Sequence, residues 1–137
     1  MEKQKKSINV CTLAKPFGAF CHATIWPEKE KDLIFVSGMT ARGVDGEVIG
    51  NDIETQTRQC LENLKSVLIE CGANMDDVMR VTVYTLNMEG LSVIHRVRSE
   101  FWPNPDRYPA STLVAVNEFV KKDFLIEIEA IAIKVNE

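Results

Sequence analysis

The sequence predicts an α+β domain in which two helices cover one face of a mixed sheet. Two segments, residues 51–72 and 89–101, carry apolar residues at the three- and four-residue spacing of an amphipathic helix. Runs rich in β-branched residues precede, separate and follow them, which gives the order strands, helix, strand, helix, strands. With 137 residues, of which 45% are hydrophobic, we expect residues 1–137 to form a single domain with a full core and a frayed segment at 1–6.

The first half of the chain predicts a strand, a tight turn and a long helix. The apolar run Leu33–Gly38 is typical of a short strand that ends in a glycine. The Asp-Gly pair within Val44–Val48 indicates a tight turn between two extended arms. Asn51 or Asp52 can cap a helix that ends near Gly72. The residues expected on its buried face are Cys60, Leu61, Leu64, Val67, Leu68 and Cys71.

The second half predicts a strand, a shorter helix and two closing strands. The β-branched content of Val78–Leu86 favours a strand, and a helix is expected over Glu89–Phe101, before two prolines that stop it. The residues expected on the buried face of this helix are Leu91, Ile94, Val97 and Phe101. Strands over Ser111–Val116 and Phe124–Val135 close the chain.

The last predicted strand has two different faces. One face is wholly apolar, because alternate residues share a face, and consists of Phe124, Ile126, Ile128, Ala130 and Ala132. Glu127 and Glu129 lie on the other face, about 7 Å apart at roughly 3.3 Å per residue. Burial and a like-charged neighbour would both raise a carboxyl pKa, which suits general acid–base chemistry. Alternatively, this is a half-exposed edge strand whose carboxylates discourage aggregation.

The apolar face of that strand also predicts self-association. Two helices can cover only one face of the sheet, and no other predicted element covers the second face. An apolar strand face left in water would be too large for a monomer, so we expect other copies of the chain to cover it.

Charge and composition exclude several classes of function. The chain has 16 basic and 20 acidic residues, a net charge of −4, which argues against a nucleic-acid partner. No apolar run has the length of a signal peptide core or a membrane span, so we expect a cytoplasmic protein without a membrane partner.

The residues typical of metal and nucleophile sites are sparse. The four cysteines have neither zinc-ligand nor redox spacing, which favours buried thiols in a reducing cytosol, with a thiol nucleophile as the alternative. His22 and His95 are the only histidines, and a structural role is favoured for each. The sequence contains no phosphate-binding glycine loop, metal cluster or serine triad.

Several segments together resemble the Rid family of small proteins, also called the YjgF family. The resemblance covers residues 10–135 and is most specific near the C-terminus. The segments that carry it are Phe20–Ala23, Leu33–Gly38, Gln56–Leu64, Tyr108–Val114 and Ile126–Ala132.

The resemblance implies a chorismate-mutase-like fold and a homotrimer whose sheets pack around the threefold axis, with a small-molecule ligand bound in clefts between subunits. The best-known members hydrolyse reactive enamines and imines without a cofactor or metal, mainly by positioning substrate and water. Glu127 matches the glutamate that orients the attacking water. The residues that the resemblance places around the substrate are Phe20, Ser37, Gly38, His95 and Ser111. Arg107, shortly before Ser111 in the chain, is a candidate substitute anchor.

Two positions depart from the family pattern. Active deaminases read Pro-Ala-Arg where this chain reads Pro-Ala-Ser at Ser111, and that arginine holds the substrate carboxylate with a two-pronged contact. Phe20 stands where a tyrosine is usual. We therefore expect a hydrolase of imines or enamines whose substrate is not a standard α-imino acid, with a non-catalytic trimeric ligand-binding or regulatory protein as the alternative. The sequence leaves open whether Arg107 or Arg98 replaces the missing charge.

Overall fold

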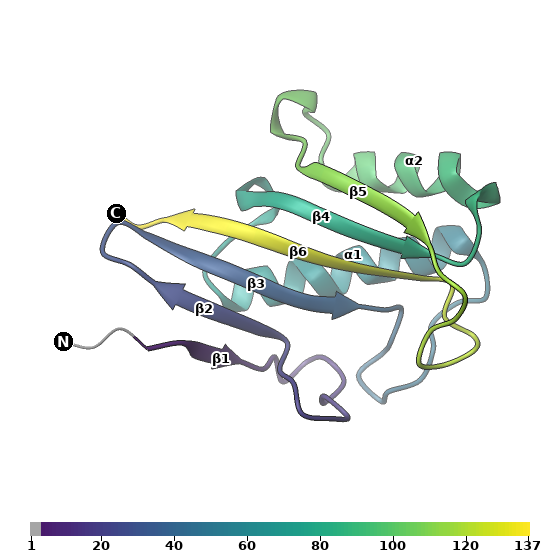
Figure 1. Ribbon diagram of the computed structural model, residues 1–137, viewed down its shortest axis with the longest axis horizontal. Helices are drawn as coiled ribbons and strands as arrows, with labels where there is room; N and C mark the ends of the chain where they lie inside the picture. Colours follow the sequence, from purple (N-terminus) through teal and green to yellow (C-terminus); the bar gives the residue numbers. More distant parts are fainter. Residues whose placement is uncertain (1–3) are drawn as a thin grey trace.

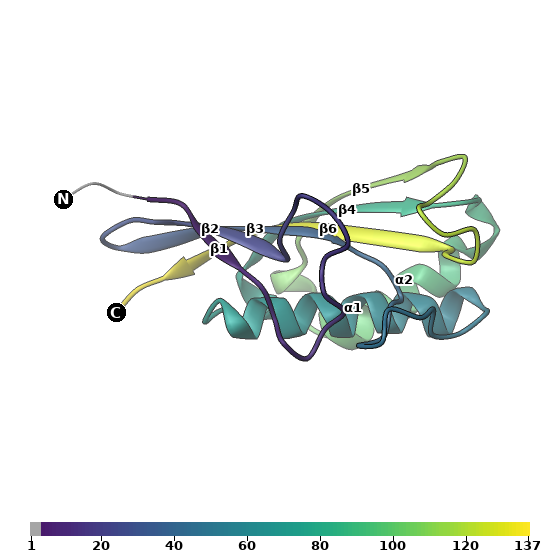
Figure 2. The ribbon, with the colours of Figure 1, turned by 90° about the horizontal axis from the view of Figure 1, so that it is seen from below.

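The computed structural model describes residues 4–137, which form a six-stranded mixed sheet with two helices on one face (Figures 1 and 2). The elements are β1 Lys6–Ile8, β2 Ala23–Pro27, β3 Lys31–Met39, α1 Ile53–Glu70, β4 Val78–Thr85, α2 Leu91–Phe101, β5 Ala110–Ala115 and β6 Ile126–Val135. Short 3₁₀ turns precede β4, α2 and β5. The strand order is β1-β2-β3-β6-β4-β5, with β4 and β5 parallel and the other neighbours antiparallel. The predicted α+β class and the two helices on one face are confirmed.

The long helix forms where the sequence predicts it. The Asp52 side chain accepts the Thr55 N–H at 2.7 Å, which caps α1 at its N-terminus. Gly72, with a φ of +80°, follows the last turn in the left-handed conformation that glycine adopts without strain. All six residues predicted for the buried stripe of α1 and its end are buried.

The N-terminal part of the sheet extends beyond the prediction. β1 and β2 pair ahead of β3, and neither was expected. Lys6 belongs to β1, while residues 1–3 of the segment expected to fray lie outside the described residues. The Asp-Gly turn is present, with Gly46 at a φ of +86°, but its arms form a single bridge between Arg42 and Val48 instead of two strands.

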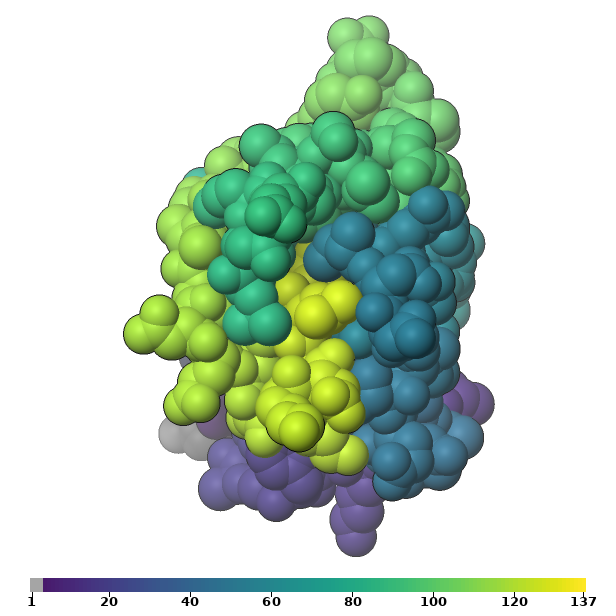
Figure 3. Space-filling model, turned by 90° about the vertical axis from the view of Figure 1, so that its right-hand side faces the viewer, coloured from purple at the N-terminus to yellow at the C-terminus, as the bar shows by residue number. Residues whose placement is uncertain are grey.

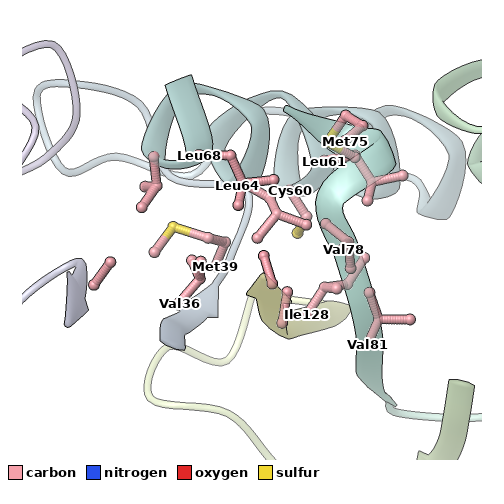
Figure 4. Packing of buried hydrophobic residues seen from close by; sticks show 14 of the residues in the cluster. Val36, Met39, Cys60, Leu61, Leu64, Leu68, Met75, Val78, Val81 and Ile128 are labelled. Carbon is pink, nitrogen blue, oxygen red and sulfur yellow. The ribbon is translucent and has the colours of Figure 1, made fainter. Parts of the chain in front are cut away.

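The wholly apolar face of β6 is the face that the helices cover. Ile126, Ile128 and Ala132 are at most 1% exposed, and Figure 4 shows Ile128 below Leu64 and Cys60 of α1. Our expectation that this face needs a second copy of the chain is therefore wrong. Its burial within one chain places Glu127 and Glu129 on the opposite, open face.

The open face carries its own apolar surface. Phe35 of β3 pairs with Ile131 of β6, and these side chains are 44% and 38% exposed. Trp26 of β2, paired with Leu33, is also exposed. β6 lies between β3 and β4, so it is a central strand and the edge-strand interpretation of its carboxylates is wrong.

Helix α2 buries the predicted face, but not along its whole length. Ile94 and Val97 are fully buried as expected, and Phe101 packs partly buried against the core, whereas Leu91, the first residue of the helix, is exposed. Arg98 lies two helical turns after Leu91 on the same face and is buried. The buried part of this face packs against α1, and Figure 1 shows α2 behind β5 at the edge of the sheet.

The chain between β5 and β6 packs at one end of the molecule. Gln56 of α1 donates to the Asp123 carbonyl at 2.8 Å and accepts the Leu125 N–H at 2.8 Å. Figure 3 shows this end, where the yellow segment lies between the blue start of α1 and the green chain that follows β4. Neither helix of the described chain is long and apolar enough to cross a membrane.

Candidate functional site

Four of the predicted site residues line one cavity of about 330 Å³. Glu127 reaches it from β6, Ser37 and Gly38 from the end of β3, and Phe20 from the loop before β2. Residues of the N-terminal loop, from Leu13 to Phe17, form its outer wall. The volume suits a small metabolite.

Gly38 lets the Glu127 carboxylate lie against the backbone of β3. A Cβ atom at position 38 would be 2.2 Å from Oε2 of Glu127 and 2.8 Å from its Cδ. No ordinary side chain fits at that distance, so only glycine allows the carboxylate to occupy this position. The register of β3 and β6 changes between Val36 and Met39, at this same point.

Burial raises the pKa of the Glu127 carboxyl above its ordinary value of 4.5, and the charge of Glu129 raises it further. Glu129, two residues along the same face, is exposed and accepts a hydrogen bond from the Tyr84 hydroxyl at 3.0 Å. The two carboxylates therefore differ in environment. Glu127 has the burial and the cavity that acid–base chemistry needs, and Glu129 has a structural partner.

His22 has the structural role that the sequence favoured. Its Nδ1 accepts the Val10 N–H at 2.9 Å, so its Nε2 carries the proton and donates to the Ala14 carbonyl at 2.9 Å. Both ring nitrogens thus hold the N-terminal loop over the cavity. Ser37 adds a second link to this loop, because its hydroxyl donates to the Cys21 carbonyl at 2.6 Å.

Arg42 also lines this cavity, and the sequence analysis missed it. Its guanidinium carbon lies 4.8 Å from the ring centre of Phe17 and 5.3 Å from that of Phe124. Asn63 of α1 donates to the carbonyls of Thr40 and Arg42, both at 3.0 Å, and so fixes this loop. The Asn63 position was within the long-helix segment of the resemblance, whereas no pattern marked Arg42.

The other predicted residues lie elsewhere. His95 and Ser111 line a second cavity of about 420 Å³ between α2 and the edge strand β5, and Arg98 lines it too. Arg107 lines neither of these two cavities, because its guanidinium donates to the Asp76 carbonyl at 3.1 Å and lies 4.0 Å from the Asp76 carboxylate. A single chain therefore holds the predicted site in two separate halves.

The cysteines differ from the expectation of four buried thiols. Cys11 is exposed and Cys21 half-buried, while Cys60 and Cys71 are buried. Burial raises the pKa of the Cys71 thiol to about 11, and it raises the pKa of Cys60 as well, so both stay protonated near neutral pH. Neither buried thiol is therefore activated as a nucleophile. Within residues 4–137, no three His, Cys, Asp or Glu side chains form a group that could hold a metal ion.

Known proteins match this chain over nearly its whole length. The model of the family described as Endoribonuclease L-PSP matches residues 13–134. A RutC family protein of Pyrococcus abyssi is 37% identical over 121 residues, which are 88% of this chain and 90% of that protein. A protein named 2-iminobutanoate/2-iminopropanoate deaminase, from Dermatophagoides farinae, is 28% identical over 94% of this chain and 96% of its own length.

A solved structure confirms the fold of the described residues. The crystal structure of Escherichia coli TdcF with bound serine matches with a TM-score of 0.81 and 25% sequence identity, over 96% of this chain and 99% of that one. That relative, which shares this fold, was crystallised with a bound small molecule.

Proposed function

Since this chain belongs to the Endoribonuclease L-PSP family, the group of Rid, YjgF and RutC proteins, we propose that it hydrolyses reactive imines and enamines to a carbonyl compound and ammonia. The family includes a protein named as a deaminase of 2-iminobutanoate and 2-iminopropanoate. The observation that carries the proposal is the Glu127 carboxylate, held half-buried against Gly38 in a cavity of metabolite size.

Glu127 is the general base of this reaction. Its carboxylate accepts a proton from water while the water oxygen bonds to the imine carbon. The electron pair of the C=N bond moves to the nitrogen, which takes this proton from Glu127 and gives the carbinolamine. Glu127 then accepts the hydroxyl proton of the carbinolamine as the C=O bond forms and the C–N bond breaks. It passes this proton to the nitrogen, which leaves as ammonia. A pKa raised by burial makes Glu127 a stronger base and a competent acid for the return step.

The complete site is formed between subunits of a homotrimer. His95 and Ser111 lie beside an edge strand, apart from the Glu127 cavity of the same chain. Packing of the open sheet faces around a threefold axis would cover the exposed Phe35 and Ile131, and it would bring the second cavity of one copy to the Glu127 cavity of its neighbour.

The substrate is not a standard α-imino acid. Ser111 lacks the charge and the two-pronged geometry of the arginine found in active deaminases. A charge-assisted contact of that kind contributes about 1.5–3 kcal/mol, so its loss costs on the order of 10–150-fold in affinity for the α-carboxylate. Phe20 in place of a tyrosine removes a further hydroxyl.

The four cysteines, with no disulfide among them, support a reducing cytoplasmic location.

The test is the hydrolysis of imines generated in situ by an amino-acid oxidase or a lyase, followed with semicarbazide as a trap. Glu127→Gln is expected to lower kcat/KM about 10²–10⁴-fold, the usual loss for a general base, while the fold stays intact. Glu129→Gln is the comparison variant, since that side chain lies on the same strand outside the first cavity. It should act only through the pKa of Glu127, which the charge of Glu129 raises, so its loss of kcat/KM should be much smaller. Full turnover in Glu127→Gln would refute the assignment. If the wild type hydrolyses none of the imines generated in this way, the alternative of a non-catalytic ligand-binding protein is favoured.

A further inference from the structure

The second cavity contains a buried guanidinium with an unpaired nitrogen. Arg98 is only 9% exposed, and its Nη1 atom is buried without a hydrogen-bond partner anywhere in residues 4–137. It is the one buried side-chain nitrogen or oxygen of the described residues in that state. A buried polar group without a partner is rare in folded proteins and is costly when it is charged.

Other arginines near α2 are paired. Arg96, on the same helix, donates to Glu54 at 2.9 Å, and Arg58 of α1 donates to Glu100 at 2.6 Å. Arg98 has no acidic partner within the described chain, and burial lowers its pKa. An apolar residue would be more stable at this position, so the charge is explained by something that it binds.

The cavity around Arg98 offers the groups that an anion needs. His95 and Ser111 contribute polar side chains, and Trp102 contributes an aromatic wall. Ser99 also lines the cavity, but its hydroxyl already donates to the Arg96 carbonyl at 2.6 Å. Burial, with the charge of Arg98, lowers the pKa of His95, so its imidazole is neutral near pH 7. Arg98 is thus the cation of this cavity.

The serine at position 111 is matched to Arg98. Both side chains line the same cavity, because Ser111 pairs with Val81 and shares the helix-side face of the sheet with it. A second guanidinium at position 111 would occupy that cavity and repel the first. The small hydroxyl leaves space for a ligand beside Arg98.

We propose that Arg98 is the anion anchor of this site and binds a carboxylate or phosphate group of the ligand from α2. The inference rests on the proposed function, since it identifies the substrate as an imine that bears such a group. Because the charge comes from α2 instead of β5, the anionic group lies in a different place from that set by an arginine at position 111. The favoured substrates therefore carry the anionic group on an atom other than the reacting carbon.

The test measures anion binding by the fluorescence of Trp102, which lines the cavity. A Trp26→Phe background removes the only other tryptophan, which lies on the open sheet face. The probes are inorganic phosphate, 2-oxobutanoate and 2-oxoglutarate, so that phosphate, a single carboxylate and a dicarboxylate are distinguished. Arg98→Met is expected to weaken binding of the preferred probe by at least about 10-fold, as expected for a lost charge-assisted contact. Arg98→Lys should weaken it less, and Arg96→Gln, on the exposed side of the same helix, should leave it unchanged.

Stability without ligand gives an independent measurement. Arg98→Met should keep or raise the Tm, because it removes an unpaired buried charge. The double variant Arg98→Met with Ser111→Arg, which moves the charge to β5, should recover part of the affinity for 2-oxobutanoate.

Three results would overturn the inference. The first is that Arg98→Met binds the probe as tightly as the wild type does, and the second is that the wild type binds none of the probes. The third is that Arg98→Met dissociates the oligomer and lowers the Tm, because a neighbouring copy would then be the partner of Arg98. These results are separate from those for Glu127. Glu127→Gln should retain probe affinity while losing turnover, so either proposal can fail alone.

Discussion

Gly38→Ala tests whether the position of the Glu127 carboxylate determines turnover. The added methyl group would lie 2.2 Å from Oε2 of Glu127, and an ordinary contact begins near 3.4 Å. The carboxylate must therefore move by about 1.2 Å, the difference between these two distances. The backbone at Gly38 has no positive φ, so the substitution strains no dihedral angle and acts through this contact.

A displacement of about 1 Å at a reacting group costs on the order of 100-fold, or about 2.7 kcal/mol of transition-state stabilisation. We expect kcat/KM of Gly38→Ala to fall by about that factor. The half-buried carboxylate can rotate toward solvent, so the Tm should fall by only a few degrees.

The assay is the semicarbazide-trapped decay of an imine that the wild type hydrolyses well, alongside thermal unfolding of each variant. Gly18→Ala is the matched control, because its methyl group would meet the Phe20 ring at an ordinary 3.5 Å. In a Glu127→Gln background, Gly38→Ala should cause no further loss, since both changes remove the same interaction. Wild-type turnover in a folded Gly38→Ala protein would refute the link between this carboxylate position and catalysis.

Further expectations concern pH, specificity and assembly. The pKa of Glu127 is higher in the folded than in the unfolded chain, so the free energy of unfolding should fall as pH rises between these two pKa values. Denaturant titrations over a pH series should show this fall in the wild type and not in Glu127→Gln. Ser111→Arg should raise activity on 2-aminoacrylate by less than about 10–150-fold, because Phe20 lacks a hydroxyl and Arg98 repels the new charge; strong wild-type activity would contradict this. Light scattering should give about three times the chain mass of 15.4 kDa and a smaller mass for Ile131→Glu, whereas a wild-type monomer at micromolar concentration would exclude the trimer.

Local patterns in the sequence were sufficient for most of the secondary structure. The helix cap at Asp52, the end of α1 at Gly72 and the β-branched run of β4 depend on neighbours within a few residues, so each was predictable. β1 and β2 were not, because short strands at the edge of a sheet are defined by their pairing partners and not by their own periodicity.

The sequence by itself also determined that Glu127 and the apolar residues of β6 lie on opposite faces, since alternation is a property of any strand. Only the tertiary structure decided which of these faces the helices cover, and hence that the exposed apolar surface is the one around Phe35 and Ile131. It alone buried Arg98 beside Ser111 and placed Arg42 between Phe17 and Phe124. The physical reason is that burial and close contact arise from packing between segments far apart in the chain. The spacing of hydrophobic residues within one segment does not indicate which other segments it will contact.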